Sequence, residues 1–168
     1  MNIALNIGCH DIHMTGFVNI DIDPEMHPDL LWDCTRLREK FEDESVSCIN
    51  AGHFLEHLSV QDGKKVVKDA FDLLAPFGVF VATCPDYSKV DGMTIEEKER
   101  IIMAEGTHLV LMDGQRLKSY LTEAGFLTSV VTSPDNNGLC PFPNVKWQTS
   151  IIGIKHHSVR FHAPLGGV

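Results

Sequence analysis

The sequence predicts an α/β fold built around a mostly parallel sheet, and three observations support this prediction. Short, nearly continuous apolar runs alternate with amphipathic stretches of helical period, as expected when helices connect buried parallel strands. The first two apolar runs end at Gly8 and Asp21, which places a glycine and a carboxylate where open α/β sheets bind ligands. The last two runs have no helix between them, which predicts an antiparallel pair at one edge of the sheet.

Seven of the apolar runs have the length of strands, and we therefore expect seven strands in the sheet. They lie at residues 3–9, 17–22, 30–33, 46–51, 79–84, 127–132 and 149–155. Residues 133–146, between the last two runs, are rich in Pro, Asn and Gly and predict a long loop.

The clearest helix lies between the fourth and fifth strands. Ser59 is a suitable N-cap, and Asp62 follows three residues later. Apolar residues at positions 66, 70 and 74 predict one buried stripe. Pro76 and Gly78 are expected to end this helix.

Two further helices are expected in the second half of the chain. One begins after Thr94, because Thr94 and Glu97 have the spacing of a capping box. The other runs from about residue 114 to residue 124, has its apolar residues on one face, and is closed by Gly125.

Length and composition indicate one domain, residues 1–168, with an ordinary hydrophobic content of 43%. The net charge of −9 argues against nucleic acid as a partner, because phosphate binding needs a basic face. No apolar stretch approaches the ~20 residues that span a bilayer, and the N-terminus lacks the basic region of a signal peptide. We therefore expect a cytoplasmic protein without membrane contact. The five cysteines are widely spaced and contain no Cys-x-x-Cys pair, which favours reduced thiols over disulfides or structural zinc.

The loop after Gly8 indicates which kind of ligand the sheet edge binds. It lacks the second and third glycines of G-x-G-x-x-G, and Asp21 follows sooner than the ~20 residues typical of dinucleotide sites. A helix of normal length hardly fits between Gly8 and Gly16, so no helix N-terminus is expected to hold a pyrophosphate. Asp21 could accept both hydroxyls of a ribose. The sequence therefore predicts a nucleoside ligand without phosphates.

Five motifs over roughly residues 3–132 resemble those of class I S-adenosylmethionine-dependent methyltransferases, in particular short ones with a truncated first crossover. They are Leu5-Asn6-Ile7-Gly8-Cys9-His10, Gly16-Phe17-Val18-Asn19-Ile20-Asp21-Ile22-Asp23-Pro24, His53-Phe54-Leu55-Glu56-His57-Leu58, Leu74-Ala75-Pro76-Phe77-Gly78-Val79-Phe80-Val81 and the segment 117–126. The resemblance implies a Rossmann-like fold with a seven-stranded sheet, and S-adenosylmethionine as the cofactor. His10 and Phe77 depart from the family pattern, since both stand where glycine is usual.

The resemblance also assigns residues to parts of the cofactor. Asp21 would take the ribose hydroxyls, although Asp23 competes for this role. Asp33 would accept from the adenine amino group, although a helix N-cap explains this residue equally well. The expected cofactor-binding residues are Asn6, Gly8, Cys9, His10, Asp21, Ile22, Asp33, Cys34, Ala51, Gly52 and His53.

The reaction that the resemblance implies is a direct displacement that methylates an oxygen or nitrogen of a small-molecule or glycan acceptor. Such an acceptor can need a general base, and the candidates are His53, His108 and Asp86, in that order. His53 and His57 are four residues apart and could share a helix face, but no third ligand has convincing spacing. We therefore expect no bound metal.

Two other classes of function remain open. A non-catalytic S-adenosylmethionine-binding partner subunit is favoured by His10 and by the shortened first crossover. A metal-dependent enzyme would use His10, His13, His53 and His57. The sequence does not define the oligomeric state, and a homodimer is one assembly consistent with it.

Overall fold

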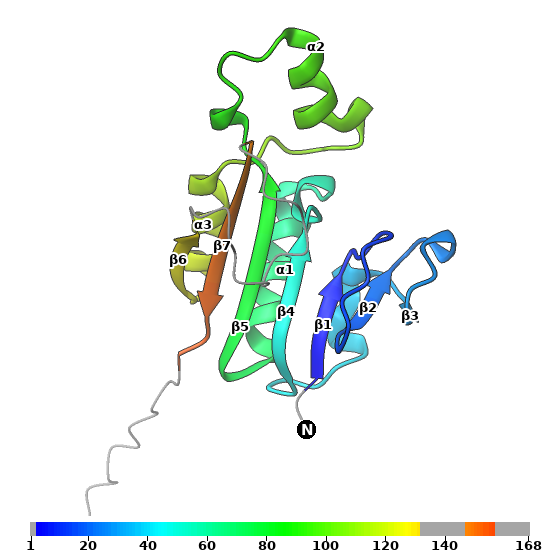
Figure 1. The fold of residues 1–168 in the computed structure, drawn as a ribbon. Coiled ribbons are helices and arrows are strands. Elements are labelled where there is room, and N and C mark those ends of the chain that lie inside the picture. The colour runs from blue at the N-terminus through cyan, green and yellow to red at the C-terminus, as the bar shows by residue number, and fades with distance from the viewer. Residues whose placement is uncertain (1–2, 132–146, 157–168) are drawn as a thin grey trace, which may run out of the picture.

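Seven strands form one sheet in the order β3-β2-β1-β4-β5-β7-β6 (Figure 1). The computed structural model describes residues 3–131 and 147–156. The strands are β1 (Ile3–Ile7), β2 (Val18–Asp21), β3 (Leu30–Leu31), β4 (Val46–Gly52), β5 (Leu74–Pro85), β6 (Leu127–Val131) and β7 (Gln148–Ile154). Strands β1 to β5 run parallel, whereas β7 is antiparallel to both of its neighbours. This confirms the expected sheet, mostly parallel with an antiparallel edge. The predicted loop at 133–146 lies outside the described residues.

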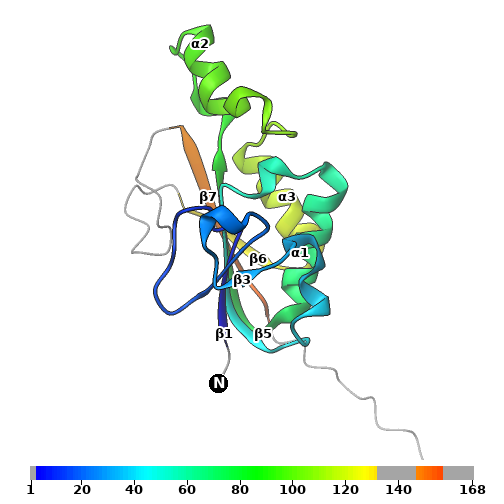
Figure 2. The same ribbon diagram turned by 90° about the vertical axis from the view of Figure 1, so that its right-hand side faces the viewer.

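Three α-helices and several short helical turns connect the strands. The helices are α1 (Val60–Leu73), α2 (Ile95–Lys98) and α3 (Gly114–Ala124). The turns are η1 (Pro24–Met26), η2 (Cys34–Glu39), η3 (Leu55–His57), η4 (Tyr87–Lys89), the π-helical η5 (Glu99–Met103) and η6 (Ala104–Gly106). Helices α1 and α3 pack on the same face of the sheet, and α2 projects beyond the carboxyl ends of the strands (Figures 1 and 2). None of the helices in the described part of the chain is long and apolar enough to cross a bilayer.

The helix ends follow the capping residues seen in the sequence. The Ser59 side chain accepts a hydrogen bond from the backbone N–H of Asp62 and begins α1. Thr94 and Glu97 form the expected capping box of α2. Gly125 closes α3 in the left-handed conformation, at φ 110°.

The start of β5 differs from the prediction. Helix α1 ends at Leu73, and β5 begins at Leu74 rather than after Gly78. Leu74 is fully buried and pairs with Val46, whereas Val79 pairs with Cys48, so the intervening residues bulge out of the ladder. Phe77 lies in this bulge at φ 64° and is 71% exposed. The apolar periodicity predicts that the helix continues through Leu74. In the structure Leu74 instead pairs with Val46 and is buried as the first residue of β5.

The hydrophobic core fills the space between the sheet and helices α1 and α3. Leu5, Ile49 and Phe80 of the central strands are fully buried, as are Val66 of α1 and Leu117 of α3. This core holds the strands in register, so that the loops at their carboxyl ends are presented from a rigid support.

Candidate functional site

A cavity of about 630 Å³ opens beyond the carboxyl ends of β1, β2 and β4. The strand order reverses between β1 and β4, and open α/β sheets bind their ligands at such a point. The volume is within the range of small-molecule sites. The cavity is lined by Gly8, His10, Ile12, Asp21, Ile22, Asp33, Cys34, Thr35, Gly52, His53, Phe54, His57, Leu58, Ala104 and His108.

Most of the predicted cofactor residues lie in this lining, and three do not. Gly8, His10, Asp21, Ile22, Asp33, Cys34, Gly52 and His53 line the cavity, whereas Asn6, Cys9 and Ala51 lie outside it. Several lining residues were not predicted, because they carry no chemistry that distinguishes them in a sequence. These are Ile12, Thr35, Phe54, Leu58 and Ala104.

Gly8 follows β1, and both its backbone conformation and the room around it favour glycine. Its φ is +61°, in the left-handed region. A Cβ atom added there would lie 2.3 Å from Cδ2 of Phe54. The Phe54 ring therefore packs directly on the main chain of Gly8, and both residues line the cavity.

Asp21, at the end of β2, organises the loop that follows β1. Its Oδ2 accepts a hydrogen bond from the backbone N–H of His10 at 2.8 Å, and its Oδ1 accepts from that of Asp23 at 3.0 Å. His10 has φ 46°, so this residue, which stands where the methyltransferases that the sequence resembles usually have glycine, lies in the left-handed region. Asp23 lies outside the lining and caps η1 by accepting from Glu25. A carboxylate can accept about four hydrogen bonds, so Asp21 keeps acceptor capacity for a ligand.

Asn6 lies outside the cavity lining and instead holds neighbouring strands and the loop after β1 by hydrogen bonds. Asn6 of β1 is in register with Asn19 of β2 and Asn50 of β4. Asn50 donates to Asn6 at 2.8 Å, and Asn6 donates to Asn19 at 3.0 Å and to the carbonyl of Ile12 at 2.8 Å. All three asparagines are buried. This amide ladder joins three strands and holds the loop that carries Ile12.

Asp33 and Cys34 follow β3 and line the cavity, and their local roles are visible. Oδ1 of Asp33 accepts from both the backbone N–H and the hydroxyl of Thr35, each at 2.8 Å, so the N-cap explanation holds. Its contact with adenine stays a prediction. Burial raises the pKa of the Cys34 thiol to about 12, and burial likewise raises that of Cys9 to about 11. Both thiols are therefore neutral and unreactive at ordinary pH.

His53 lies at the end of β4 between two polar side chains. Its Nε2 is 3.1 Å from Oε1 of Gln148, and its Nδ1 is 3.3 Å from Oε1 of Glu56. The backbone of His53 has φ 51°, and its N–H donates to the carbonyl of Thr83 at 2.8 Å. The ring of Trp147 meets the imidazole edge-on at 5.9 Å between centroids. His53 is therefore held by contacts from several elements beside the cavity.

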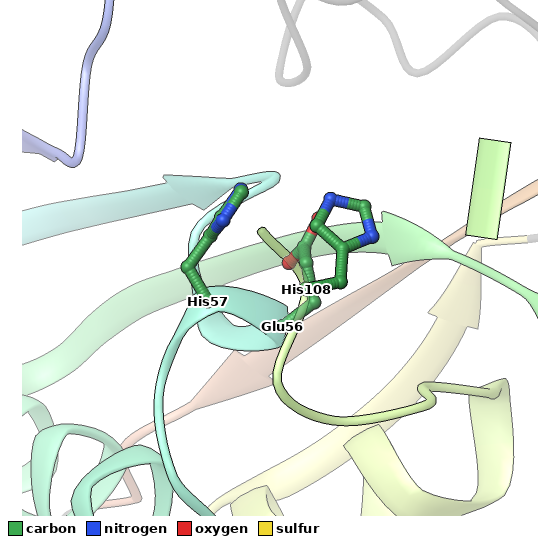
Figure 3. A group of neighbouring side chains, drawn as sticks. All are labelled: Glu56, His57 and His108. Atoms are coloured by element: carbon green, nitrogen blue, oxygen red, sulfur yellow. The ribbon is translucent and has the colours of Figure 1, made fainter. Parts of the chain in front are cut away.

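Glu56, His57 and His108 form a cluster (Figure 3), and His53 adjoins it through the contact of its Nδ1 with Glu56. One carboxylate oxygen of Glu56 and one ring nitrogen of each histidine all lie within 4.8 Å of one another. The two imidazole rings meet edge-on at 4.6 Å between centroids. His108 is brought there because the N–H groups of Leu109 and Val110 donate to the carbonyl of Glu56, at 2.9 and 3.2 Å.

The four histidines considered for a metal-dependent enzyme do not come together. Nδ1 of His10 is 2.8 Å from Oδ1 of Asp11, and Nε2 of His13 is 3.0 Å from the carbonyl of Met26 in η1. Within residues 3–131 and 147–156, the group with metal-ligand spacing is instead Glu56, His57 and His108. The sequence could not indicate this set, because its third member lies 51 positions from the second.

Asp86, the third candidate base, lies outside the cavity lining. It is 2% exposed and caps η4, where its Oδ1 accepts from the backbone N–H of Ser88 at 3.0 Å and from its hydroxyl at 2.5 Å. Its Oδ2 is 3.7 Å from Nζ of Lys89. The structure therefore assigns Asp86 to the turn after β5 and leaves His53 and His108 as the candidate bases at the cavity.

Comparison with solved structures places this fold among methyltransferases. An S-adenosylmethionine-dependent methyltransferase from Archaeoglobus fulgidus matches with a TM-score of 0.69 and 14% identity, over 92% of this chain and 86% of that one. One from Methanosarcina mazei matches at 0.63 and 16% identity, over 91% and 92%. One from Thermotoga maritima matches at 0.62 and 14%, over 92% and 83%. No protein-family model and no curated protein sequence matches this chain. At these identities the likeness shows the Rossmann-like methyltransferase fold.

Proposed function

We propose that this protein is an S-adenosylmethionine-dependent methyltransferase that acts on a small-molecule or glycan acceptor, at an oxygen or nitrogen atom. One observation carries the proposal: three parallel strands bring Gly8, Asp21 and Gly52 to one cavity at the point where the strand order reverses. The shared fold with solved S-adenosylmethionine-dependent methyltransferases supports it.

The lining offers groups that match the parts of this cofactor. The Asp21 carboxylate suits ribose hydroxyls, because ionised acceptors make the stronger hydrogen bonds. Ile22 lines the cavity with 69% of its surface exposed and offers apolar contact to a flat base. Gly8 and Gly52 bring the main chain close to the cavity without side chains. A long loop without a helix follows Gly8, which fits a ligand without pyrophosphate.

The protein has to orient the acceptor, because the cofactor itself supplies the reactive group. When bound, the cofactor supplies an already activated methyl group on its sulfonium. The chain's own residues must then orient the acceptor and exclude water, and orientation alone can contribute on the order of 7–11 kcal/mol. His53 is the first candidate for a base, since its ring lies at the cavity with Glu56 3.3 Å from Nδ1. Glu56 and Gln148 lie on either side of the ring and define where the imidazole sits beside the cavity.

Calorimetry and thermal shift with S-adenosylmethionine and S-adenosylhomocysteine test the proposal. Either ligand should raise the melting temperature, because it binds the native state only. NAD at equal concentration is the control and should have no effect, because the loop after Gly8 lacks the pyrophosphate glycines. Absence of heat and of a thermal shift with both ligands at millimolar concentration would overturn the proposal.

A transfer assay with radiolabelled methyl donor then distinguishes an enzyme from a binding subunit. Pools of hydroxyl-bearing sugars and of amines serve as acceptors. Incorporation into either pool identifies the acceptor class. Cofactor binding without incorporation into any acceptor favours the non-catalytic partner subunit.

A further inference from the structure

The buried carboxylate of Glu56 is incompletely satisfied by its protein surroundings. Glu56 is 1% exposed, and neither of its side-chain oxygens has a hydrogen-bond partner among the described residues. Nδ1 of His53 approaches Oε1 to 3.3 Å without hydrogen-bond geometry. A buried charge is expensive unless it is paired or coordinates a metal ion. A cation at this position would therefore explain how an acidic side chain is accommodated here.

The two histidines beside Glu56 are both set in the tautomer that a metal ligand needs. Nδ1 of His57 is 3.2 Å from the carbonyl of Thr107, and Nδ1 of His108 is 2.7 Å from the carbonyl of Ile102. A carbonyl only accepts, so each Nδ1 carries a hydrogen, and in the neutral imidazole Nε2 keeps its lone pair. Metal-binding histidines are held in this way, with the second ring nitrogen donating to a backbone carbonyl.

We propose that Glu56, His57 and His108 bind one divalent transition-metal ion at the edge of the cavity. The ligand atoms lie within 4.8 Å of one another. Ligands at about 2.0–2.2 Å from a metal are roughly 3–3.5 Å apart, so the side chains need to close by at most about 1.3–1.8 Å. Figure 3 shows the three side chains next to one another, from η3 and from the segment before α3.

The ligand set indicates which metal ions fit. Two imidazoles and one carboxylate suit Zn²⁺, Co²⁺, Fe²⁺ or Mn²⁺, whereas Mg²⁺ and Ca²⁺ prefer oxygen ligands throughout. Three protein ligands leave further coordination positions open, as in catalytic rather than structural sites. His57 and His108 both line the cavity, so the open positions are available to a ligand there.

Because the cluster adjoins His53, a metal ion bound there would contact the methyl acceptor. This inference rests on the proposed function. A metal ion with open positions binds an oxygen of the acceptor and lowers the pKa of a hydroxyl group. The acceptor class that this site favours is therefore a hydroxyl compound, in preference to an amine that is protonated at neutral pH.

Metal binding is tested on the full chain without an affinity tag, after removal of metal with a chelator. Co²⁺ is titrated with visible absorption as the readout, and metal content is measured by mass spectrometry after desalting. Wild type should bind about one equivalent with a ligand-field spectrum that includes nitrogen ligands. Glu56→Gln and His57→Ala should each weaken Co²⁺ binding at least about tenfold, as changes around metal sites do. His57 is exposed, so its loss should leave the fold intact.

His156→Ala is the matched control, because this exposed histidine follows β7 and lies outside the cluster. It should bind Co²⁺ as wild type does. Co²⁺ should also raise the melting temperature of wild type and of His156→Ala, but not that of Glu56→Gln. Wild type that binds no Co²⁺ or Zn²⁺ at micromolar concentration overturns the proposal. So does equal binding by Glu56→Gln, His57→Ala and wild type.

Calorimetry with S-adenosylmethionine on the metal-free protein keeps the two proposals separate. Cofactor binding without metal binding overturns the metal site and leaves the proposed function in place. Metal binding without cofactor binding supports the metal site and overturns the proposed function.

Discussion

Replacing Gly8 by alanine tests whether the end of β1 needs glycine for its backbone conformation or for its packing. Gly8 lies at φ +61°, and a Cβ atom there would be 2.3 Å from the Phe54 ring. Gly16, in the same loop, lies at φ +85° with no atom within 4 Å of the corresponding position. The two substitutions therefore share the conformational penalty, and only Gly8→Ala adds a steric clash.

The two effects have different expected sizes. The left-handed conformation costs an alanine about 1–2 kcal/mol, and the stiffer unfolded chain returns about 0.4–1 kcal/mol. Gly16→Ala should thus lower the free energy of unfolding by about 0.5–1.5 kcal/mol. Overpacking adds about 1–3 kcal/mol, so Gly8→Ala should lower it by roughly 2–4 kcal/mol.

Urea denaturation of the single variants and of a Phe54→Ala background provides the measurement. Without the Phe54 ring, only the Cβ of residue 54 at 3.1 Å stays near the added methyl group, so Gly8→Ala should cost little more than Gly16→Ala. The predicted clash is contradicted if Gly8→Ala and Gly16→Ala lower the free energy of unfolding equally in the wild-type background. It is also contradicted if Gly8→Ala lowers that free energy equally with and without the Phe54 ring. In that case the backbone at Gly8 would have to relax away from the ring.

Three further predictions concern ligand binding and thiol chemistry. Asp21→Ala should raise the dissociation constant for S-adenosylmethionine at least tenfold in calorimetry, because hydrogen bonds to an ionised group contribute roughly 1.5–3 kcal/mol each; a larger effect of Asp23→Ala would contradict the assignment. His53→Ala should lower methyl transfer by roughly 10²–10⁴ with cofactor affinity nearly unchanged; joint loss of melting temperature and affinity would indicate a packing role instead. Burial raises the pKa of Cys9 to about 11 and of Cys34 to about 12, so both should resist iodoacetamide near pH 8 until urea unfolds the chain, as followed by peptide mass spectrometry. Fast alkylation of the folded protein would show that these thiols are ionised or exposed.

Features with a local physical cause were predicted correctly from the sequence. The caps at Ser59, Thr94 and Gly125 depend on hydrogen bonds between residues three or four positions apart. The antiparallel edge followed from the absence of a helix between two apolar runs. The position of Gly8 and Asp21 at the cavity was predicted because Gly8 follows β1 and Asp21 ends β2, and parallel strands present their carboxyl ends to one crevice.

Side-chain direction and long-range pairing were decided only by the tertiary structure. Asn6 was expected to face the cofactor, but the registers of β1, β2 and β4 place it in a ladder with Asn19 and Asn50. Asp86 follows β5 much as Asp21 ends β2, yet Asp86 caps η4 in the turn after the strand. A carboxylate after a strand therefore predicts a position at the crevice, whereas the turn that follows decides whether it faces the crevice.

The sequence by itself determined that the strands exist, most of their ends, and the helix caps, because these depend on neighbours along the chain; the start of β5 is the exception. The cluster of Glu56, His57 and His108 was decided by the tertiary structure alone. It requires a segment about 50 residues away to close onto η3 through backbone hydrogen bonds to Glu56. This closure depends on how the intervening elements from α1 to η6 pack, so the spacing of residues along the chain does not predict it.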